Sequence, residues 1–377
     1  MNLEEYTKAL ENLTTKSENL TIKVSEMLRR TLCLTSANLG NFLPKISGEQ
    51  HERVLKNILL NKDKSVLDGK YRSILEHVHY ENKTGNITSL LFNVPSIIYT
   101  FHIGSMQLTN HFLAYNKIKY SFIASKKTLD EHLGDFLEMA EFQKQNYGEL
   151  ELSYIEADES TSLLKMIRAL KNGKHLLIYI DGNIGSGERI AEKRNMSNIN
   201  FFDRQISVRS GAAILSYLCE VPMIGVVNYR NKKHENCMYF IDPVFPKKKE
   251  HRLVECRSLM QYAYYKFSEI LNKFPDQWEC WIYLHLWVDT SNFEYQPTEA
   301  FRASSYQFNN GDFGLFMIDR SCYLFCKRNY QSFFIDESIY NSLVQYTNEL
   351  IPGTLFPEEI TDQFLKRGVF KNVKNRL

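Results

Sequence analysis

The chain has 377 residues, of which 44% are hydrophobic and 24% charged, enough for more than one packed core. Its formal net charge of +2 offers no electrostatic case for nucleic-acid binding. No run of about 18 apolar residues occurs, so we expect no membrane span. The polar first twenty residues do not resemble a signal peptide. Seven scattered cysteines without a CxxC pair predict reduced thiols in a cytoplasmic protein and no metal site.

Residues 1–84 are expected to form a helical region, because 20–32 (LTIKVSEMLRRTL) carries apolar residues at helical spacing. Between residues 85 and 292, short apolar runs alternate with helical segments. The apolar runs are 96–101, 119–125, 150–157, 174–180 and 221–229. This alternation predicts an α/β domain with a central, mostly parallel sheet and flanking helices. A long helix is expected over 252–274. It follows the dense basic run 246–252 (PKKKEHR), expected to be a solvated loop or a docking site for an acidic partner or phosphate.

The first candidate site residue is His102, which ends the apolar run 96–101 and precedes Gly104 and Ser105. Ligands of open α/β sheets bind at the carboxyl ends of the strands. A histidine in this place suits a general base. The alternative is a histidine that only makes a hydrogen bond in a loop.

A second candidate is Asp181, which ends the run 174–180 and precedes a glycine-rich loop with Gly182, Gly185 and Gly187. This loop has neither of the common phosphate-binding glycine motifs, so a nucleotide site is not favoured. A third stretch, 274–287, holds all three tryptophans of the chain and is expected to be an aromatic core cluster.

In order and spacing, these stretches resemble the lysophospholipid acyltransferase superfamily, and most closely the lipid A late (lauroyl and myristoyl) acyltransferases. That family has a strand leading into H-x-x-x-x-[DE], which corresponds here to 102–107 (HIGSMQ). The other motifs correspond to Asp181, Phe201-Phe202, Gly211-Ala212-Ala213, Val221-Pro222-Met223-Ile224 and Pro275-Asp276-Gln277-Trp278. The resemblance extends over about residues 85–290.

The resemblance implies transfer of a fatty acyl group from an acyl thioester, on an acyl carrier protein or coenzyme A, to an amine or hydroxyl. The acceptor would be a peptide or a small metabolite, in lipid or natural-product biosynthesis. His102 would be the base and Gln107 would orient its imidazole, without any cofactor. Backbone amides near Gly104 and Ser105 would hold the oxyanion, assisted by an arginine. The residues expected to contact substrate are Gly104, Ser105, Asp181, Arg204 and Arg209.

Gln107 departs from the family, which has an acid at this position. A neutral amide can orient an imidazole but supplies no charge, so His102 would be a weaker base. Three explanations follow. The acceptor is an amine that needs little deprotonation, another carboxylate such as Asp181 approaches His102, or the chain has lost catalysis. In the last case it would be a non-catalytic acyl-chain or peptide-binding protein.

Residues 305–377 predict a small α+β module of three short strands followed by two helices, after a linker near 292–304. The module loosely resembles the winged-helix domains that capture leader peptides by adding a strand to a sheet edge. This resemblance implies a peptide partner, and the alternative is a purely structural cap. We expect no N-terminal membrane anchor of the kind usual among lipid A acyltransferases, but an amphipathic helix there would allow peripheral contact with a membrane.

Overall fold

The computed structural model describes residues 1–22, 25–71, 73–148, 152–182, 195–248, 250–297 and 299–373. The chain divides into two compact units. The first comprises Met1–Leu20 and Val54–Cys280, and the second comprises Thr21–Arg53 and Trp281–Leu377. The N-terminal region 1–84, which the sequence suggested as one helical region, is thus shared between the two units. The second unit begins again at Trp281 and not after residue 292.

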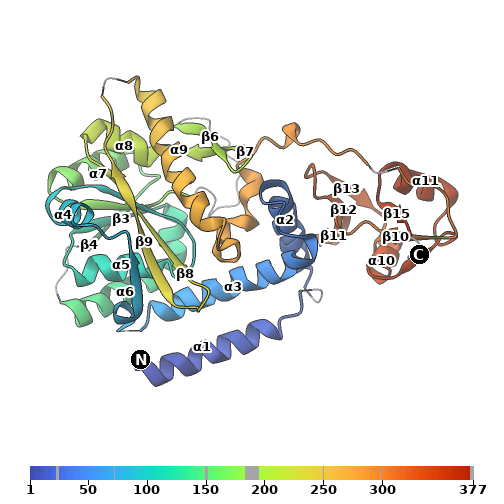
Figure 1. The fold of residues 1–377 in the computed structure, drawn as a ribbon, viewed down its shortest axis with the longest axis horizontal. Coiled ribbons are helices and arrows are strands. Elements are labelled where there is room, and N and C mark those ends of the chain that lie inside the picture. Colours follow the sequence, from blue (N-terminus) through green and yellow to red (C-terminus); the bar gives the residue numbers. More distant parts are fainter. Residues whose placement is uncertain are drawn as a thin grey trace. The chain divides into compact units, whose positions relative to one another are not determined.

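The first unit is built on a seven-stranded sheet, which confirms the predicted α/β fold with a mostly parallel central sheet (Figure 1). The strand order is β1-β9-β8-β2-β5-β3-β4, and only the pair β8–β9 is antiparallel among the described strands of this sheet. The strands are β1 (Val78–Glu81), β2 (Ile97–Thr100), β3 (Tyr120–Ala124), β4 (Leu152–Glu156), β5 (His175–Tyr179), β8 (Met223–Arg230) and β9 (Asn236–Val244). All of β2 and β8 is buried, as expected of inner strands covered on both faces.

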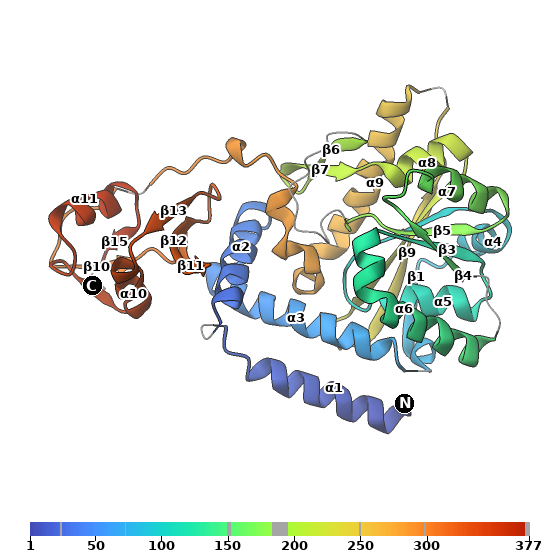
Figure 2. The ribbon, with the colours of Figure 1, turned by 180° about the vertical axis from the view of Figure 1, so that it is seen from behind.

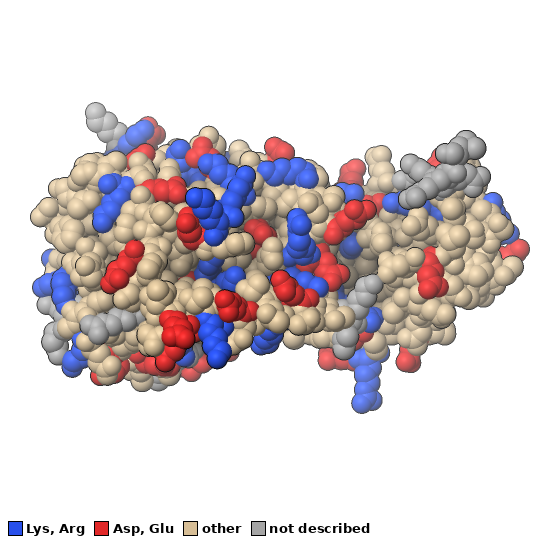
Figure 3. Space-filling view, turned by 60° about the horizontal axis from the view of Figure 1, so that its bottom comes forward, with Lys and Arg blue, Asp and Glu red and all other residues tan. Residues whose placement is uncertain are grey.

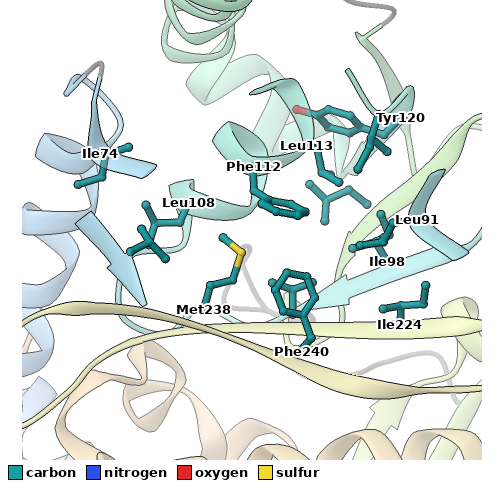
Figure 4. Packing of buried hydrophobic residues seen from close by; sticks show 14 of the residues in the cluster. Ile74, Leu91, Ile98, Leu108, Phe112, Leu113, Tyr120, Ile224, Met238 and Phe240 are labelled. Carbon is teal, nitrogen blue, oxygen red and sulfur yellow. The ribbon is translucent and has the colours of Figure 1, made fainter. Parts of the chain in front are cut away.

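Helices cover both faces of this sheet (Figures 1 and 2). Alternation along β2 separates two cores: Ile98 joins the cluster around Phe112, whereas Tyr99 and Phe101 face α9, where Phe101 stacks on Phe267 at 3.8 Å. Figure 4 shows Phe112 and its neighbours on α5 directed at the sheet residues Ile98 and Phe240. The helices are α4 (Gly85–Asn93), α5 (Gln107–Tyr115) and α6 (Lys126–Tyr147) on one face, and α7 (Ser162–Lys171), α8 (Gly211–Cys219) and α9 (Arg252–Leu271) on the other.

A buried polar network attaches α1 (Leu3–Glu18) to the first unit. The hydroxyl of Tyr6 donates to Asp68 at the end of α3 (His51–Asp68), with an O···O distance of 2.5 Å. Arg230 at the end of β8 forms an ion pair with the same carboxylate and donates to Asn61 at 2.9 Å. Because a buried carboxylate is costly without partners, this network fixes α3 across the carboxyl end of β8.

A β-hairpin of β6 (Met196–Phe201) and β7 (Arg204–Arg209) packs on α9. Its last buried ring, Phe201, meets Tyr264 and Trp278 edge to face at 5.8 and 5.5 Å. The hairpin therefore covers the aromatic core that underlies the carboxyl ends of β2 and β5.

The second unit contains the predicted C-terminal α+β module, completed by a helix from the N-terminal region. The elements are the meander β11 (Phe313–Ile318), β12 (Ser321–Cys326) and β13 (Ser332–Ile335), the sheet β14 (Leu350–Pro352), β10 (Ser305–Phe308) and β15 (Phe370–Asn372), and helices α10 (Glu337–Gln345) and α11 (Glu358–Lys366). Strand alternation directs Leu315 into the core with α10 and α11. It directs Phe316 against Cys33 and Ala37 of α2 (Glu26–Phe42). The helix α2 is therefore part of this unit.

No helix in the described part of the chain is both long and apolar enough to cross a bilayer. On the face drawn in Figure 3, acidic and basic side chains are interspersed, in keeping with a formal net charge of +2.

We expect Gly314→Ala to destabilise the second unit, because a Cβ at this position would lie 2.4 Å from Sγ of Cys33 on α2. Overpacking of this kind costs about 1–3 kcal/mol. The free energy of unfolding from denaturant titration measures the effect. Removing the sulfur with Cys33→Ala should restore most of the loss in the double variant. Gly311→Ala is the matched control, since its Cβ would meet only Oδ1 of Asn309 at 3.6 Å. Equal effects of the two glycine substitutions would contradict the packing of α2 on β11.

Candidate active site

The register of the sheet places His102 beside Asp181. Strands β2 and β5 are parallel neighbours in which Thr100 is paired with Tyr179. His102 and Asp181 each lie two residues beyond these partners, so both side chains emerge at the carboxyl edge of the sheet. His102 Nδ1 lies 2.7 Å from Oδ1 of Asp181. The carboxylate that approaches the histidine is therefore Asp181, which was one of the three explanations offered for the missing acid.

The Asp181 carboxylate is fully buried and accepts hydrogen bonds from several donors. Its Oδ2 accepts from the backbone N–H of His102 and from the indole N–H of Trp278, both at 2.8 Å. The thiol of Cys280 donates to the same oxygen at 3.6 Å. A carboxylate held in this way stays in one orientation, which in turn fixes the imidazole of His102.

The loop after β2 is shaped by Gly104, which adopts a positive φ of 55°. A Cβ here would lie 2.5 Å from the carbonyl oxygen of Asn228 on β8, so only glycine fits. The segment that begins with η4 (Pro275–Gln277) closes over this loop. Gly104 N–H donates to the carbonyl of Gln277 at 3.2 Å, and Glu279 N–H donates to that of His102 at 2.9 Å. The loop, β8 and the segment after α9 thus form one rigid support for His102.

His102 is arranged as a base. A carboxylate only accepts hydrogen bonds, so Nδ1 of the neutral imidazole carries the proton and Nε2 holds the lone pair. Nε2 makes no hydrogen bond with the described residues, and the side chain is 29% exposed. Burial by itself lowers the pKa of His102. The charge and hydrogen bond of Asp181 outweigh this effect, with a contribution from Glu279, and the pKa is raised above its ordinary value of 6.5.

Donor atoms of His102, Asp181 and Cys280 lie within 4.8 Å of one another, close enough to be examined as metal ligands. The residues do not fit a metal ion well. The carboxylate oxygens already accept four hydrogen bonds, and an ion would displace the donors. Burial, followed by the charge of Asp181, raises the pKa of the Cys280 thiol well above its ordinary value, so the thiolate that metals bind is disfavoured. The cluster is better explained as a hydrogen-bonded support.

Gln107 does not orient the imidazole of His102. It is the first residue of α5, and its Cγ lies 3.2 Å from the place that a Cβ on Gly69 would occupy. All hydrogen bonds of the His102 ring within the described residues go to Asp181. The predicted role of Gln107 is therefore wrong in its geometry. Four residues outside the helix separate His102 from α5, so the spacing by itself could not show which way Gln107 points.

Apart from Asp181, the other predicted site residues make no hydrogen bond with the His102 ring within the described part of the chain. Gly104 is in the loop, but its amide already donates to Gln277, so it does not serve as a free oxyanion donor in this conformation. The Ser105 hydroxyl is fully buried and makes no hydrogen bond within the described chain. Arg204 and Arg209 are exposed at the two ends of β7, and the hydrogen bonds of His102 and Asp181 involve neither. Gly185 and Gly187 lie outside the described residues.

Sequence reasoning missed the contacts that the tryptophan-rich stretch makes with the site. Trp278 is completely buried, as the aromatic-core interpretation requires, but its indole N–H also binds Asp181. Glu279 next to it pairs with Lys62 of α3, with 2.7 Å between Nζ and Oε1. This ion pair lies near His102, because both charges affect the pKa of its ring. The spacing of Trp278 from Asp181 along the chain gives no signal for these contacts.

A scan against models of known protein families finds no match for this chain. A search of curated proteins finds none either.

We expect Asp181→Asn to lower the pKa of His102 below 6.5, because the charge that raises it is removed while the burial that lowers it stays. NMR titration of the imidazole Cε1–H measures this pKa. Glu279→Gln is the comparison and should have a smaller effect, since the carboxylate of Glu279 is paired with Lys62. An unchanged pKa in Asp181→Asn would exclude the pairing.

The same pairing predicts how stability depends on pH. Because the folded-state pKa of His102 is raised, its contribution to the free energy of unfolding is complete below about pH 6.5. It should be lost as the pH rises through the folded-state pKa. The difference in the free energy of unfolding between the natural sequence and His102→Gln, from urea titrations at several pH values, should therefore shrink as the pH rises through that pKa. A difference that grows with pH would contradict this sign.

Proposed function

We propose that this protein is an acyltransferase that moves a fatty acyl group from an acyl thioester to an amine or hydroxyl. The contact that carries the proposal is the one between His102 Nδ1 and the buried Asp181 carboxylate at the carboxyl edge of the sheet. In this reaction Nε2 of His102 takes the acceptor's proton as its nitrogen or oxygen bonds to the thioester carbonyl carbon. The C–S bond then breaks, and the imidazolium returns the proton to the leaving thiolate.

The arrangement supports this reaction in three ways. Asp181 supplies the negative charge that stabilises an imidazolium, which a neutral Gln107 would not supply. The raised pKa of His102 makes the ring a stronger base in its neutral form. The site lies at the edge where open parallel sheets bind ligands. These features also support a divergent relationship to the lysophospholipid acyltransferase superfamily, in which Asp181 takes the place of the acid at the usual spacing.

The proposed donor is an acyl carrier protein or coenzyme A, and the proposed location is the cytoplasm. The Ser105 hydroxyl is a candidate oxyanion donor, because it is buried next to Gly104 and has no partner within the described residues. We assign Arg204 and Arg209 to the anionic part of the donor, because both are basic and exposed on the hairpin.

The alternative is a non-catalytic protein that binds an acyl chain or a peptide. The main reason to consider this alternative was the neutral side chain of Gln107 at a position where the family has an acid. The contact of Asp181 with His102 weakens that motivation, because the histidine has a carboxylate partner from another strand. Turnover separates the two functions, since a binding protein releases no free thiol from an acyl thioester.

The test is incubation of the protein with acyl thioesters and a mixture of amines and alcohols, followed by mass spectrometry and thiol release. We expect His102→Gln to reduce thiol release by about 10²-fold or more, the usual effect of losing a general base. His79→Gln is the matched control, because His79 is an exposed histidine on β1. Turnover that survives in folded His102→Gln would assign the base to another group, and no turnover with any donor would favour the binding protein.

Activity should rise with pH through the raised pKa of His102, because only the neutral ring accepts a proton.

We further propose that the second unit binds a peptide along β13. This strand is paired with β12 and with no other described strand, so one edge is open. The N–H of Cys326 donates to the carbonyl of Gln331, so Gln331 and every second residue after it face β12. The amide of Phe334 lies between these positions and therefore points to the open edge. The side chain of Phe334 is 68% exposed on this strand. Open strand edges bind extended peptides through backbone hydrogen bonds, which would bring a peptide acceptor to the enzyme.

We expect Phe334→Pro to weaken peptide binding about tenfold, because proline removes an edge N–H without breaking the ladder to β12. Phe334→Ala keeps the amide and controls for the lost ring. Binding of a labelled peptide library, enriched by selection on the protein, provides the measurement. If the alanine and proline variants bind equally well, the backbone edge is not the binding element. Deleting the residues after 300 is a poor test, because it would uncover the apolar face of α2.

A further inference from the structure

The basic run after β9 lies at the opposite edge of the sheet from His102. Strand β9 is antiparallel to β8, so β9 ends where β8, β2 and β5 begin. The start of α9 lies beside α8 there, as both ribbon views show (Figures 1 and 2). We call this surface the basic corner. Its residues are Lys171, Leu218, Glu220, Phe245, Lys247, Lys248, Glu250, Arg252, Leu253 and Val254.

The segments of the basic corner are held together by direct contacts. Nζ of Lys248 lies 3.3 Å from Glu220 and 4.7 Å from the ring centre of Tyr217 at the end of α8. The hydroxyl of Tyr217 donates to the carbonyl of Glu250 at 3.2 Å. Lys247 N–H donates to the buried Glu255 in the first turn of α9 at 2.9 Å. The basic loop is therefore anchored against the ends of α8 and α9, and its lysines stay close to the apolar residues there.

The basic corner combines positive charge with exposed apolar side chains. It carries the basic residues Lys171, Lys247, Lys248 and Arg252, against the acids Glu220 and Glu250. Four large apolar side chains are exposed among them, with Phe245 at 51% and Leu253 at 62%, together with Leu218 and Val254. A solvated loop explains the lysines but not four exposed apolar side chains around them. Lysines bind anionic headgroups, while such side chains enter the boundary with the acyl chains.

We propose that the basic corner binds the surface of a bilayer that contains anionic lipids. An acidic protein is the other occupant that the charge would allow. A carrier docked here would present its acyl group at the edge of the sheet opposite to His102. A membrane needs no such access to His102. The preference for a membrane over a carrier rests on the proposed function, whereas the charge and the exposed apolar side chains of the basic corner do not.

The test is co-sedimentation of the full chain with vesicles of phosphatidylcholine alone or with about one third phosphatidylglycerol. We expect binding to the anionic vesicles at low ionic strength and its loss in high salt, because exposed charges are screened. The double variant Lys247→Glu/Lys248→Glu should lower the partition coefficient by about tenfold or more. Phe245→Ser should also weaken binding to the anionic vesicles at low ionic strength, because it removes an exposed apolar ring without changing the charge.

The matched control is Lys232→Glu/Lys233→Glu, which reverses two adjacent exposed lysines at the turn between β8 and β9, at the other end of these strands. This variant should bind vesicles like the natural sequence, and thermal unfolding should show that all variants are folded. Equal loss in the two lysine variants, or no binding to anionic vesicles, would overturn the proposal. Retention on immobilised polyglutamate without vesicle binding would replace the membrane by an acidic protein.

Discussion

Asp181 is a carboxylate without solvent exposure, and such a group is costly to bury unless its oxygens accept hydrogen bonds. The donors come from separate parts of the chain: the ring and amide of His102 after β2, and Trp278 and Cys280 after α9. Each donor is held in place by the need to satisfy the same group. The carboxylate therefore joins two strand ends to a segment about a hundred residues further along the chain. The geometry of His102 depends on this one buried charge.

Close backbone packing gives this arrangement its rigidity. The loop after β2 approaches β8 at a distance that only Gly104 permits, and Gln277 lies over both. The Gln277 side chain donates to the carbonyl of Arg230 and accepts from its amide, both at 2.7 Å. Arg230 in turn holds α3 through Asp68 and Asn61. A continuous set of hydrogen bonds thus runs from the site to the N-terminal helices, which gives these helices a structural role in the first unit.

In the second unit, both faces of the small β11–β13 meander carry apolar side chains that must be buried. The face with Leu315 is covered by α10 and α11, which follow it in the chain. The face with Phe316 is covered by α2, from nearly three hundred residues earlier. A three-stranded sheet with a bare apolar face would not be stable alone. The N-terminal region is therefore divided between the two units, and the C-terminal module is not complete without it.

Some features of this protein were determined by the sequence alone. Apolar runs alternating with helical segments predicted the parallel sheet, because each inner strand must be apolar on both faces. The position of His102 and Asp181 after such runs was enough to place both at one edge of the sheet. Other features were decided only by the tertiary structure. The partner of His102 is Asp181 and not Gln107, because strand order and register bring β5 beside β2. The contacts of Trp278 with Asp181 and of α2 with β11 join segments that are far apart in the sequence, so no local spacing of residues predicts them.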